Sequence, residues 1–363
     1  MLTMNLVIYG AQGIALGVYK SIKIFFPEKD ILCFLVTEKG QNSDFLNLVP
    51  VRELQGFASG LTQKEKDEIE VLISTPENVM DEIESSLNQA GLYHSVRINS
   101  DRWAVMMKNF FLKTGKYLPL EAYPVGCKKA DLYVCKMIHY KDKQLKNVVV
   151  DSEYMKKLQV GVYRTPRCEA DFYDNEGDNI SDKNGNYSEL TGLYWMWKNQ
   201  VQLDSDKSEH YYGLAHYRRQ LQLSEDDILR LQDNDIDVVL PYPMPYEPSI
   251  EAHHNRYLKD MEWNAVLAAL KELHPEYAEA FQGILQQEYL YNYNVILAKG
   301  NVLDDYCGWL FPILFKVEEI NDPKGERPAN RYIGYIGETL ETLYFMYHKD
   351  NLRMTHTGCL FCT

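Results

Sequence analysis

The sequence lacks several features that would point to whole classes of protein. Its 363 residues contain no run that approaches the roughly 20 consecutive apolar residues needed to span a bilayer. Its 38 Lys and Arg residues are outnumbered by 52 Asp and Glu residues, and the formal net charge is −14. That balance excludes the broad basic surface by which proteins bind DNA or RNA. A bound anion would need a local site built from a few cationic side chains and backbone N–H groups.

Cysteine is scarce and follows no pattern. The seven cysteines are odd in number and scattered, which predicts free thiols in a reducing cytoplasm rather than a disulfide framework. Cys359 and Cys362 form a single CxxC in residues 351–363, which we expect to be a tail. Without a second pair this motif does not predict a zinc site. We therefore expect a cytoplasmic protein whose contact with the inner membrane face is at most peripheral.

The chain is long for one hydrophobic core, and its length favours two domains. Residues 1–125 alternate strand-like and helix-like segments: "LVIYG", then "AQGIALGVYKSIKIF", then the strands "ILCFLV" and "EVLIST" and an amphipathic helix over 76–92. This alternation predicts a Rossmann-like unit with a parallel sheet. A helix after residue 100 and a connector with two prolines lead into the second region.

Three glycines lie at the first strand-to-helix turn. Gly10, Gly13 and Gly17 have the spacing G-x-x-G-x-x-x-G, which departs from the dinucleotide fingerprint G-x-G-x-x-G. Glycine there lets the backbone approach a phosphate at a helix N-terminus. The same residues also permit close packing, so cofactor binding and a packing or regulatory role both stay open.

A second α/β region occupies residues 130–350. Its expected strands include 130–140, "YYGLAHYRR" at 211–219, "DIDVVLPYP" at 235–243 and "YLYNYNVILAKG" at 289–300, with helices over 187–199, 224–234, 263–285 and 304–320. The mixture of strands and helices predicts an α/β fold.

A polar and aromatic stretch, "GDNISDKNGNYSELTGLYWMWKN", precedes one of these strands. We expect its tryptophans to belong to an amphipathic helix that packs on the core. The many hydrogen-bonding side chains before that helix favour a bound ligand. The candidate ligand contacts are Asn179, Lys183, Asn184 and Glu189.

The strand that follows ends in four polar residues. His216, Tyr217, Arg218 and Arg219 are expected at the carboxyl edge of a sheet, where open α/β folds bind ligands. Arginine forms bidentate hydrogen bonds with phosphate oxygens and keeps its charge. Adjacent residues of a strand point to opposite faces, so only one arginine would meet the ligand unless the strand has already ended. The alternative is a solvated basic strand end.

Together with "YNYNVILAKG", "YCGWLF" and "RYIGYIGETLETLY", these motifs carry a resemblance over residues 131–347. The sequence resembles the capsular and exopolysaccharide glycosyltransferases, a family long described only as a domain of unknown function. The resemblance implies a GT-A-like nucleotide-sugar domain next to the Rossmann-like one. It also implies that the protein transfers a hexose from a UDP-linked nucleotide-sugar to an oligosaccharide or lipid-linked glycan of a bacterial surface polysaccharide. UDP-galactofuranose is among the donors that the resemblance allows.

The metal question is open in the sequence. Most GT-A enzymes hold Mg²⁺ or Mn²⁺ on a DxD motif at the end of a strand. The two DxD strings here, at 204–206 and 235–237, precede or open their strands, and the place of the motif is taken by His216-Tyr217-Arg218-Arg219. We therefore name no metal ligands, allow a divalent cation as cofactor, and expect the arginines to stabilise the diphosphate.

Acid–base chemistry needs a carboxylate to take the proton of the acceptor hydroxyl. Glu338, after a glycine-punctuated turn, is the first candidate for this base, and Asp178 is the second. Asn294 lies on an expected strand where its amide can bind a sugar hydroxyl. His253 and His254 are expected on an acceptor loop or on the surface.

Two other classes of function fit parts of the sequence. A nucleotide-sugar-binding scaffold of a polysaccharide assembly complex would bind UDP without catalysis. A dinucleotide-dependent oxidoreductase would use Gly10, Gly13 and Gly17 and bind NAD(P)H.

Overall fold

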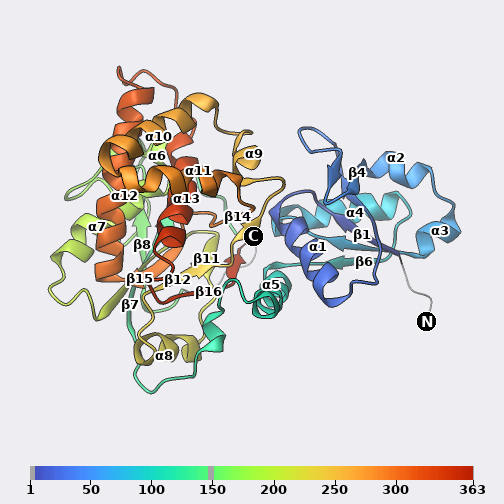
Figure 1. The fold of residues 1–363 in the computed structure, drawn as a ribbon, viewed down its shortest axis with the longest axis horizontal. Helices are drawn as coiled ribbons and strands as arrows, with labels where there is room; N and C mark the ends of the chain where they lie inside the picture. Colours follow the sequence, from blue (N-terminus) through green and yellow to red (C-terminus); the bar gives the residue numbers. More distant parts are fainter. Residues whose placement is uncertain (1–4, 146–150, 363) are drawn as a thin grey trace. The chain divides into compact units, whose positions relative to one another are not determined.

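The structure, a computed structural model, describes residues 5–145 and 151–362. It divides the chain into two compact units (Figure 1). The smaller unit holds residues up to 117 together with 244–247, and the larger holds 118–243 and 248–362. The valines at 148–150 lie outside the described part of the chain.

The smaller unit is built on one sheet. Its strand order is β3-β4-β2-β1-β5-β6, and all neighbours are parallel except β3 and β4. The strands are β1 (Asn5–Tyr9), β2 (Ile31–Val36), β3 (Phe45–Leu46), β4 (Val49–Glu53), β5 (Ile69–Ile73) and β6 (Ser95–Arg97), and β13 (Met244–Pro245) also belongs to this unit. The helices are α1 (Gly13–Phe25), α2 (Leu54–Ser59), α3 (Gln63–Asp67), α4 (Met80–Gln89) and α5 (Ser100–Thr114).

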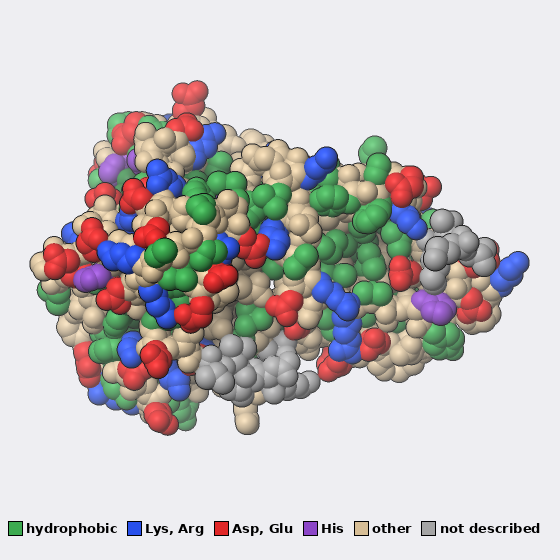
Figure 2. Space-filling model, turned by 90° about the horizontal axis from the view of Figure 1, so that it is seen from below, with side chains coloured by type: hydrophobic (Ala, Val, Ile, Leu, Met, Phe, Trp, Pro, Cys, Tyr) green, Lys and Arg blue, Asp and Glu red, His purple; other side chains and the backbone are tan. Residues whose placement is uncertain are grey.

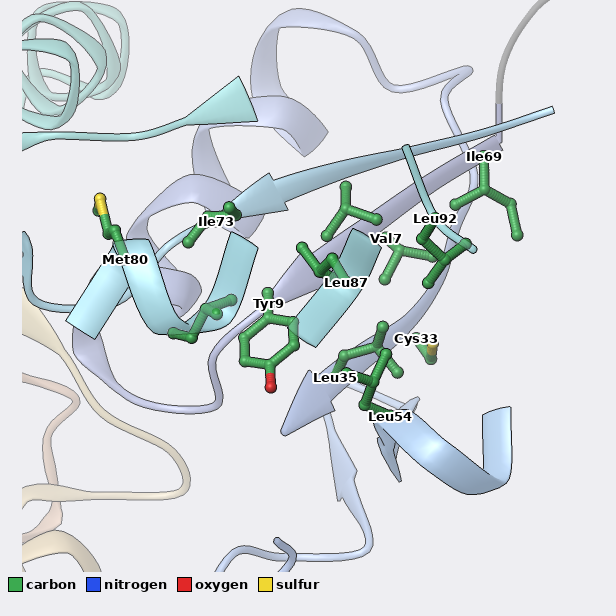
Figure 3. Packing of buried hydrophobic residues seen from close by; sticks show 12 residues of the cluster. Val7, Tyr9, Cys33, Leu35, Leu54, Ile69, Ile73, Met80, Leu87 and Leu92 are labelled. Atoms are coloured by element: carbon green, nitrogen blue, oxygen red, sulfur yellow. The ribbon is translucent and has the colours of Figure 1, made fainter. Parts of the chain in front are cut away.

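Buried aliphatic side chains hold α4 to this sheet. Val7 and Ile73 come from neighbouring strands, and Met80 and Leu87 come from one side of α4 (Figure 3). Tyr9 lies between Ile73 and Leu35 in this cluster, and its hydroxyl meets Thr37 Oγ1 at 2.9 Å. The predicted alternation of strand and helix is confirmed, because each strand buries the apolar run that marked it.

Packing accounts for the glycines at the first turn of this unit. Gly10 has φ 124°, and a Cβ there would lie 2.5 Å from the carbonyl oxygen of Ser74. A Cβ on Gly13 would lie 3.0 Å from Cβ of Met244, beside the N-terminus of α1 where a phosphate would bind. A Cβ on Gly17 would lie 2.9 Å from the indole nitrogen of Trp103 in α5.

The larger unit has a mixed sheet. Its order is β16-β12-β15-β10-β7-β8-β9, with β11 beside β10 and β17 beside β11. β7 to β10 run parallel, and β15 is antiparallel to β10 and β12. Its strands are β7 (Asp131–Ile138), β8 (Met155–Gln159), β9 (Phe172–Tyr173), β10 (His210–His216), β11 (Arg219–Leu221), β12 (Val238–Pro241), β14 (Tyr289–Leu290), β15 (Ile296–Lys299), β16 (Met354–Thr357) and β17 (Cys359–Phe361).

Helices cover this sheet on both faces. Ile228 and Leu231 of α8 pack on Leu132, Tyr211 and Val239, while α10 to α13 gather on the opposite side (Figure 1). Helix α7 is buried all round, so its Trp195 and Trp197 are core residues. The helices are α6 (Asn184–Tyr187), α7 (Leu190–Asn199), α8 (Glu225–Asp233), α9 (Ile250–His254), α10 (Asp260–Leu273), α11 (Ala278–Gln286), α12 (Gly300–Asn321) and α13 (Tyr332–Tyr347). The predicted α/β fold is confirmed.

Four sequence predictions need correction. The segment 351–363 is not a tail, because β16 pairs with β12 and β17 pairs with β11. The expected strand over 211–219 ends at His216, and the expected strand over 289–300 is interrupted between β14 and β15. The expected helix over 263–285 is divided near Pro275 into α10 and α11, because proline lacks the N–H that continues a helix.

Charge is distributed rather than concentrated on the surface. On the face in Figure 2, Lys and Arg side chains of the larger unit are interspersed with Asp and Glu. Within residues 5–145 and 151–362, no helix combines the length and the apolar character needed to cross a membrane.

Replacing Gly17 with valine should destabilise the smaller unit. The added carbons would collide with Trp103, whose indole N–H is held by the carbonyl of Ile14 at 3.3 Å, so we expect a loss of about 1–3 kcal/mol. Gly56→Ala is the control, because nothing lies within 4 Å of its added Cβ, and it should be neutral or stabilising. Urea unfolding measures both. Equal effects of the two changes would contradict the packing account.

Candidate functional site

Strands β7, β8, β9 and β10 of the larger unit run parallel and end at one edge of the sheet. His216, the last residue of β10, is in register with Met137 near the end of β7. The chain reverses directly after His216, since His216 pairs with Arg219 at the start of β11. The residues that the sequence predicts at a carboxyl edge are therefore at that edge, where α/β folds commonly bind ligands.

The reversal brings the two arginines together. The guanidinium carbons of Arg218 and Arg219 lie 5.5 and 4.9 Å from the ring centroid of Phe361. Arg219 also lies 3.9 Å above the ring of Tyr293, and Arg218 lies 5.1 Å from that of Tyr217. The strand has ended before the arginines, so the alternation of a strand does not send them to opposite faces.

The positive charge of this pair is only partly compensated. Within the described part of the chain, neither arginine forms an ion pair, and the Nε atoms of both are buried without a hydrogen-bond partner. Burial raises the pKa of Asp142 to about 6, while a backbone N–H of His139 and the charge of Arg218 oppose that rise. Two guanidinium groups held near one ring repel each other, and an anion between them would relieve the repulsion.

Beside the arginines is a cluster of buried carboxylates. The amide nitrogen of Asn294 donates to Oε1 of Glu189 at 2.8 Å, and the backbone N–H of Tyr293 donates to Oε1 of Glu338 at 2.8 Å. Tyr293 and Asn294 have φ of 76° and 49°, in the left-handed region of backbone conformation that residues other than glycine rarely adopt. This strained turn between β14 and β15 binds both glutamates and so fixes their separation.

Two glycines let α13 approach this cluster. The sequence predicts that Glu338 directly follows a turn. In the structure it lies in the second turn of α13. A Cβ on Gly337 would lie 2.7 Å from Leu190 and 3.1 Å from Oδ1 of Asn294, and one on Gly334 would contact Ser188. The glycines that the sequence analysis interpreted as a turn thus serve a close helix contact.

His254 lies behind Glu338. It is fully buried, contrary to the expected surface position, and it stacks on Trp263 at 5.8 Å between ring centroids. Its Nδ1 meets Oγ1 of Thr339 at 3.1 Å, and its Nε2 lies 3.6 Å from Oε2 of Glu338. At 3.6 Å this second contact is longer than a hydrogen bond, and Nε2 of His254 is buried without a hydrogen-bond partner among the described residues.

Two further side chains of the cluster, Glu341 and His216, have shifted pKa values. Burial, together with the charges of Glu338 and Glu189, raises the pKa of Glu341 well above its ordinary value. Burial and the nearby charges of Arg219 and Arg331 lower the pKa of His216 to about 4, although Glu189 opposes that shift. His216 is therefore neutral at pH 7, with its Nε2 lacking a partner among the described residues.

The other predicted residues lie apart from this cluster. Asp178 accepts the hydroxyl of Tyr194 at 3.1 Å, beside the C-terminal half of α7. Lys183 pairs with Glu318 of α12 at 2.7 Å. The side chains of Asn179 and Asn184 bind local groups: the carbonyl of Gly177 for the first, and the carbonyl of Ser188 with the hydroxyl of Thr191 for the second. These four residues fold the segment before α7.

Asp174 is a buried residue that the sequence analysis missed. Its carboxylate accepts the N–H groups of Gly161 and Val162 at 2.7 and 3.1 Å, and the hydroxyls of Ser181 and Thr191 at 2.6 and 3.1 Å. It ties the loop after β8 to the start of α7. The sequence around Asp174 contains other acidic residues, and only burial distinguishes Asp174 from them. Its role could therefore not be predicted from the sequence.

The DxD strings do not reach this edge. Asp204 binds His210 and the hydroxyl of Tyr212 at the start of β10, and Asp237 pairs with Lys299 at 3.1 Å. Lys299 is in register with Tyr211, so both strings lie at the amino edge of the parallel strands. Within the described residues, no group of three or more His, Cys, Asp or Glu side chains is placed to hold a metal ion. The residues at hand do not fit a metal held by DxD.

Comparison with known proteins places this site in context. A family model described as a domain of unknown function (DUF4422) matches residues 135–350. No curated protein matches the sequence. Among solved structures, the chain is similar to the apo structure of the bifunctional glycosyltransferase WbbM, with a TM-score of 0.53 and 24% identity over 64% of this chain and 45% of that one. The chain thus spans less than half the length of WbbM, and the likeness shows the fold alone.

The stability of the larger unit should depend on the protonation of His216. The pKa of His216 in the folded chain, about 4, lies below the ordinary value of 6.5, so between these pH values the unfolded state binds more protons. Its contribution to the free energy of unfolding is therefore complete above pH 6.5 and falls toward pH 4. Urea unfolding at pH 7 and pH 5 should show a smaller loss for His216→Gln than for the native chain. An equal loss of unfolding free energy between pH 7 and pH 5 in the two proteins would contradict the lowered pKa of His216.

Proposed function

We propose that this chain, which belongs to the DUF4422 family, is a glycosyltransferase whose donor binds at the carboxyl edge of the larger unit. The observation that carries the proposal is the pair formed by Arg218 and Arg219, whose buried Nε atoms have no hydrogen-bond partner among residues 5–145 and 151–362. A nucleotide-sugar supplies a diphosphate, which matches two guanidinium groups in charge and in hydrogen-bond geometry. The glycosyltransferase-like fold supports the same ligand class.

In this proposal the arginines act on the leaving group. The oxygen of an acceptor hydroxyl attacks the anomeric carbon of the donor, and the bond from that carbon to the phosphate oxygen breaks. The nucleoside diphosphate leaves with the electron pair, and the guanidinium groups stabilise its growing negative charge. They supply at this edge the positive charge that a DxD-bound metal supplies in other enzymes of the GT-A type.

Glu338 is the base that we propose for the acceptor proton. One of its oxygens is held by the N–H of Tyr293, and the other faces His254 at 3.6 Å. Glu189 is bound on both oxygens, by Asn294 at 2.8 Å and by Arg331 at 3.6 Å, which leaves it to position its neighbours. Asp178 is less suited, because it lies with Tyr194 and Asn199.

The donor that we propose is a UDP-hexose, and the acceptor is a glycan of a bacterial surface polysaccharide. The sequence motifs support these finer assignments through their resemblance to capsular and exopolysaccharide glycosyltransferases. UDP-galactofuranose belongs to the donors that the resemblance allows.

UDP should stabilise the chain against heat, and the arginines should carry that effect. A ligand at a hundred times its dissociation constant adds about 2.7 kcal/mol, which is visible as a rise in melting temperature. Arg218→Ala and Arg219→Ala should each weaken UDP binding by roughly 10- to 100-fold, since a hydrogen bond to a charged group contributes about 1.5–3 kcal/mol.

The matched control is Arg353→Ala, because Arg353 lies with Asp235 and Asp237 at the opposite edge of the sheet. The ligands to compare are UDP, GDP, CMP and NADH, each in EDTA and in Mn²⁺. A UDP shift that requires Mn²⁺ and ignores both arginines would overturn the role given to the pair. A shift with NADH alone would favour an oxidoreductase.

Glu338→Gln should separate binding from catalysis. The amide keeps the shape of the side chain but cannot take a proton, so transfer should fall by about 10²- to 10⁴-fold while the UDP shift stays. Release of UDP from UDP-hexoses, with and without added glycans, measures the reaction. A native chain that binds UDP and never releases it from a UDP-hexose would be a binding scaffold.

A further inference from the structure

Two tyrosines form a stacked pair next to Glu338. The ring centroids of Tyr257 and Tyr335 are 4.6 Å apart and the rings are inclined by 15°. Tyr257 follows α9 and is 47% exposed, whereas Tyr335 lies in α13 and is half-buried. One face of the Tyr257 ring is thus covered by Tyr335, and a large part of that side chain remains open to solvent.

The pair adjoins the carboxylate cluster. Tyr335 precedes Glu338 by three residues on α13, which places both side chains on the same side of the helix. His254, which faces Glu338 at 3.6 Å, lies 6.3 Å from the ring of Tyr335. The half-buried ring of Tyr335 therefore lies within one helical turn of the base that we propose, and the exposed ring of Tyr257 is stacked on it.

The charge near this pair is compensated, in contrast to the arginine pair. Arg331 lies 5.9 Å from the ring centroid of Tyr335 and is 62% exposed in its side chain. It is 3.6 Å from Oε2 of Glu189, and its Nε donates to the hydroxyl of Ser188 at 3.0 Å. The charge of Arg331 is thus already paired with Glu189, which favours a neutral sugar over an acidic one.

We propose that Tyr257 and Tyr335 form the platform on which a neutral hexose of the glycan acceptor stacks, an inference that rests on the proposed function. The C–H face of a pyranose packs on an aromatic ring, and its hydroxyls remain free for hydrogen bonds at the edge. The anionic donor and the neutral acceptor are thereby recognised by different chemistry on the two sides of the carboxylates.

Saturation-transfer NMR with methyl glucoside, methyl galactoside and methyl mannoside tests the platform without knowledge of the full acceptor. At least one of these hexosides should bind the native chain, and Tyr257→Ala should weaken that binding by roughly 2- to 10-fold, the range expected for loss of aromatic stacking. Tyr257→Phe keeps the ring face and should bind as the native chain does. Tyr93→Ala, which removes a 62% exposed tyrosine from the smaller unit, is the matched control.

The UDP melting shift is measured on the same four proteins and should be unchanged by the tyrosine substitutions. If UDP stabilises all four but no hexoside binds, or Tyr257→Ala binds as tightly as the native chain, the platform is wrong and the donor site stands. If UDP has no effect on the native chain while hexoside binding depends on Tyr257, the proposed transferase is wrong and the platform stands as a sugar site.

Discussion

The reversal of the chain immediately after β10 is the constraint on which the site depends. Because β10 ends at His216 and β11 begins at Arg219, two guanidinium groups meet one phenylalanine ring at the carboxyl edge of the sheet. Electrostatic repulsion opposes this arrangement, and no ion pair with either arginine offsets it in the described residues. The pairing of β11 with β17 holds the reversal in place, so the last described strand supports the proposed anion site.

The second constraint is the burial of carboxylates beside that positive charge. Glu189, Glu338 and Glu341 are each less than a tenth exposed, and burial disfavours their charged forms. The structure meets this cost for two of them with hydrogen bonds from Asn294 and Tyr293, at the expense of two left-handed backbone conformations. Oε2 of Glu341 has no hydrogen-bond partner among the described residues, and burial together with the charges of Glu338 and Glu189 raises the pKa of Glu341 well above its ordinary value. Strain and burial are concentrated where the chemistry is proposed.

Much of the fold could be predicted from the sequence, because its signals are local. The alternation of apolar strands and amphipathic helices gave the α/β class, and the polar end of β10 gave the edge at which Arg218 and Arg219 lie. The tail and the interrupted strands could not be predicted this way. β17 is a strand because β11 offers it a partner, and that contact joins residues about 140 positions apart in the sequence.

In the carboxylate cluster, too, some residues could be predicted from local sequence and others could not. Glu189, Asn294 and Glu338 were each found by residue type and neighbourhood, but their contact depends on α13 approaching α7 through Gly334 and Gly337. His254, Asp174 and the Tyr257–Tyr335 pair carried no local signal, since their roles arise from burial and from partners distant in sequence. Lys183 and Asp178 were chosen for their chemistry, and tertiary contacts account for them instead.

The most direct measurement of the central claim is a crystal structure of the chain with UDP bound in the presence of EDTA. The account predicts the diphosphate within hydrogen-bond distance of the guanidinium groups of Arg218 and Arg219, beside His216. A diphosphate bound at the Gly10 turn of the smaller unit, or held away from both arginines, would contradict it.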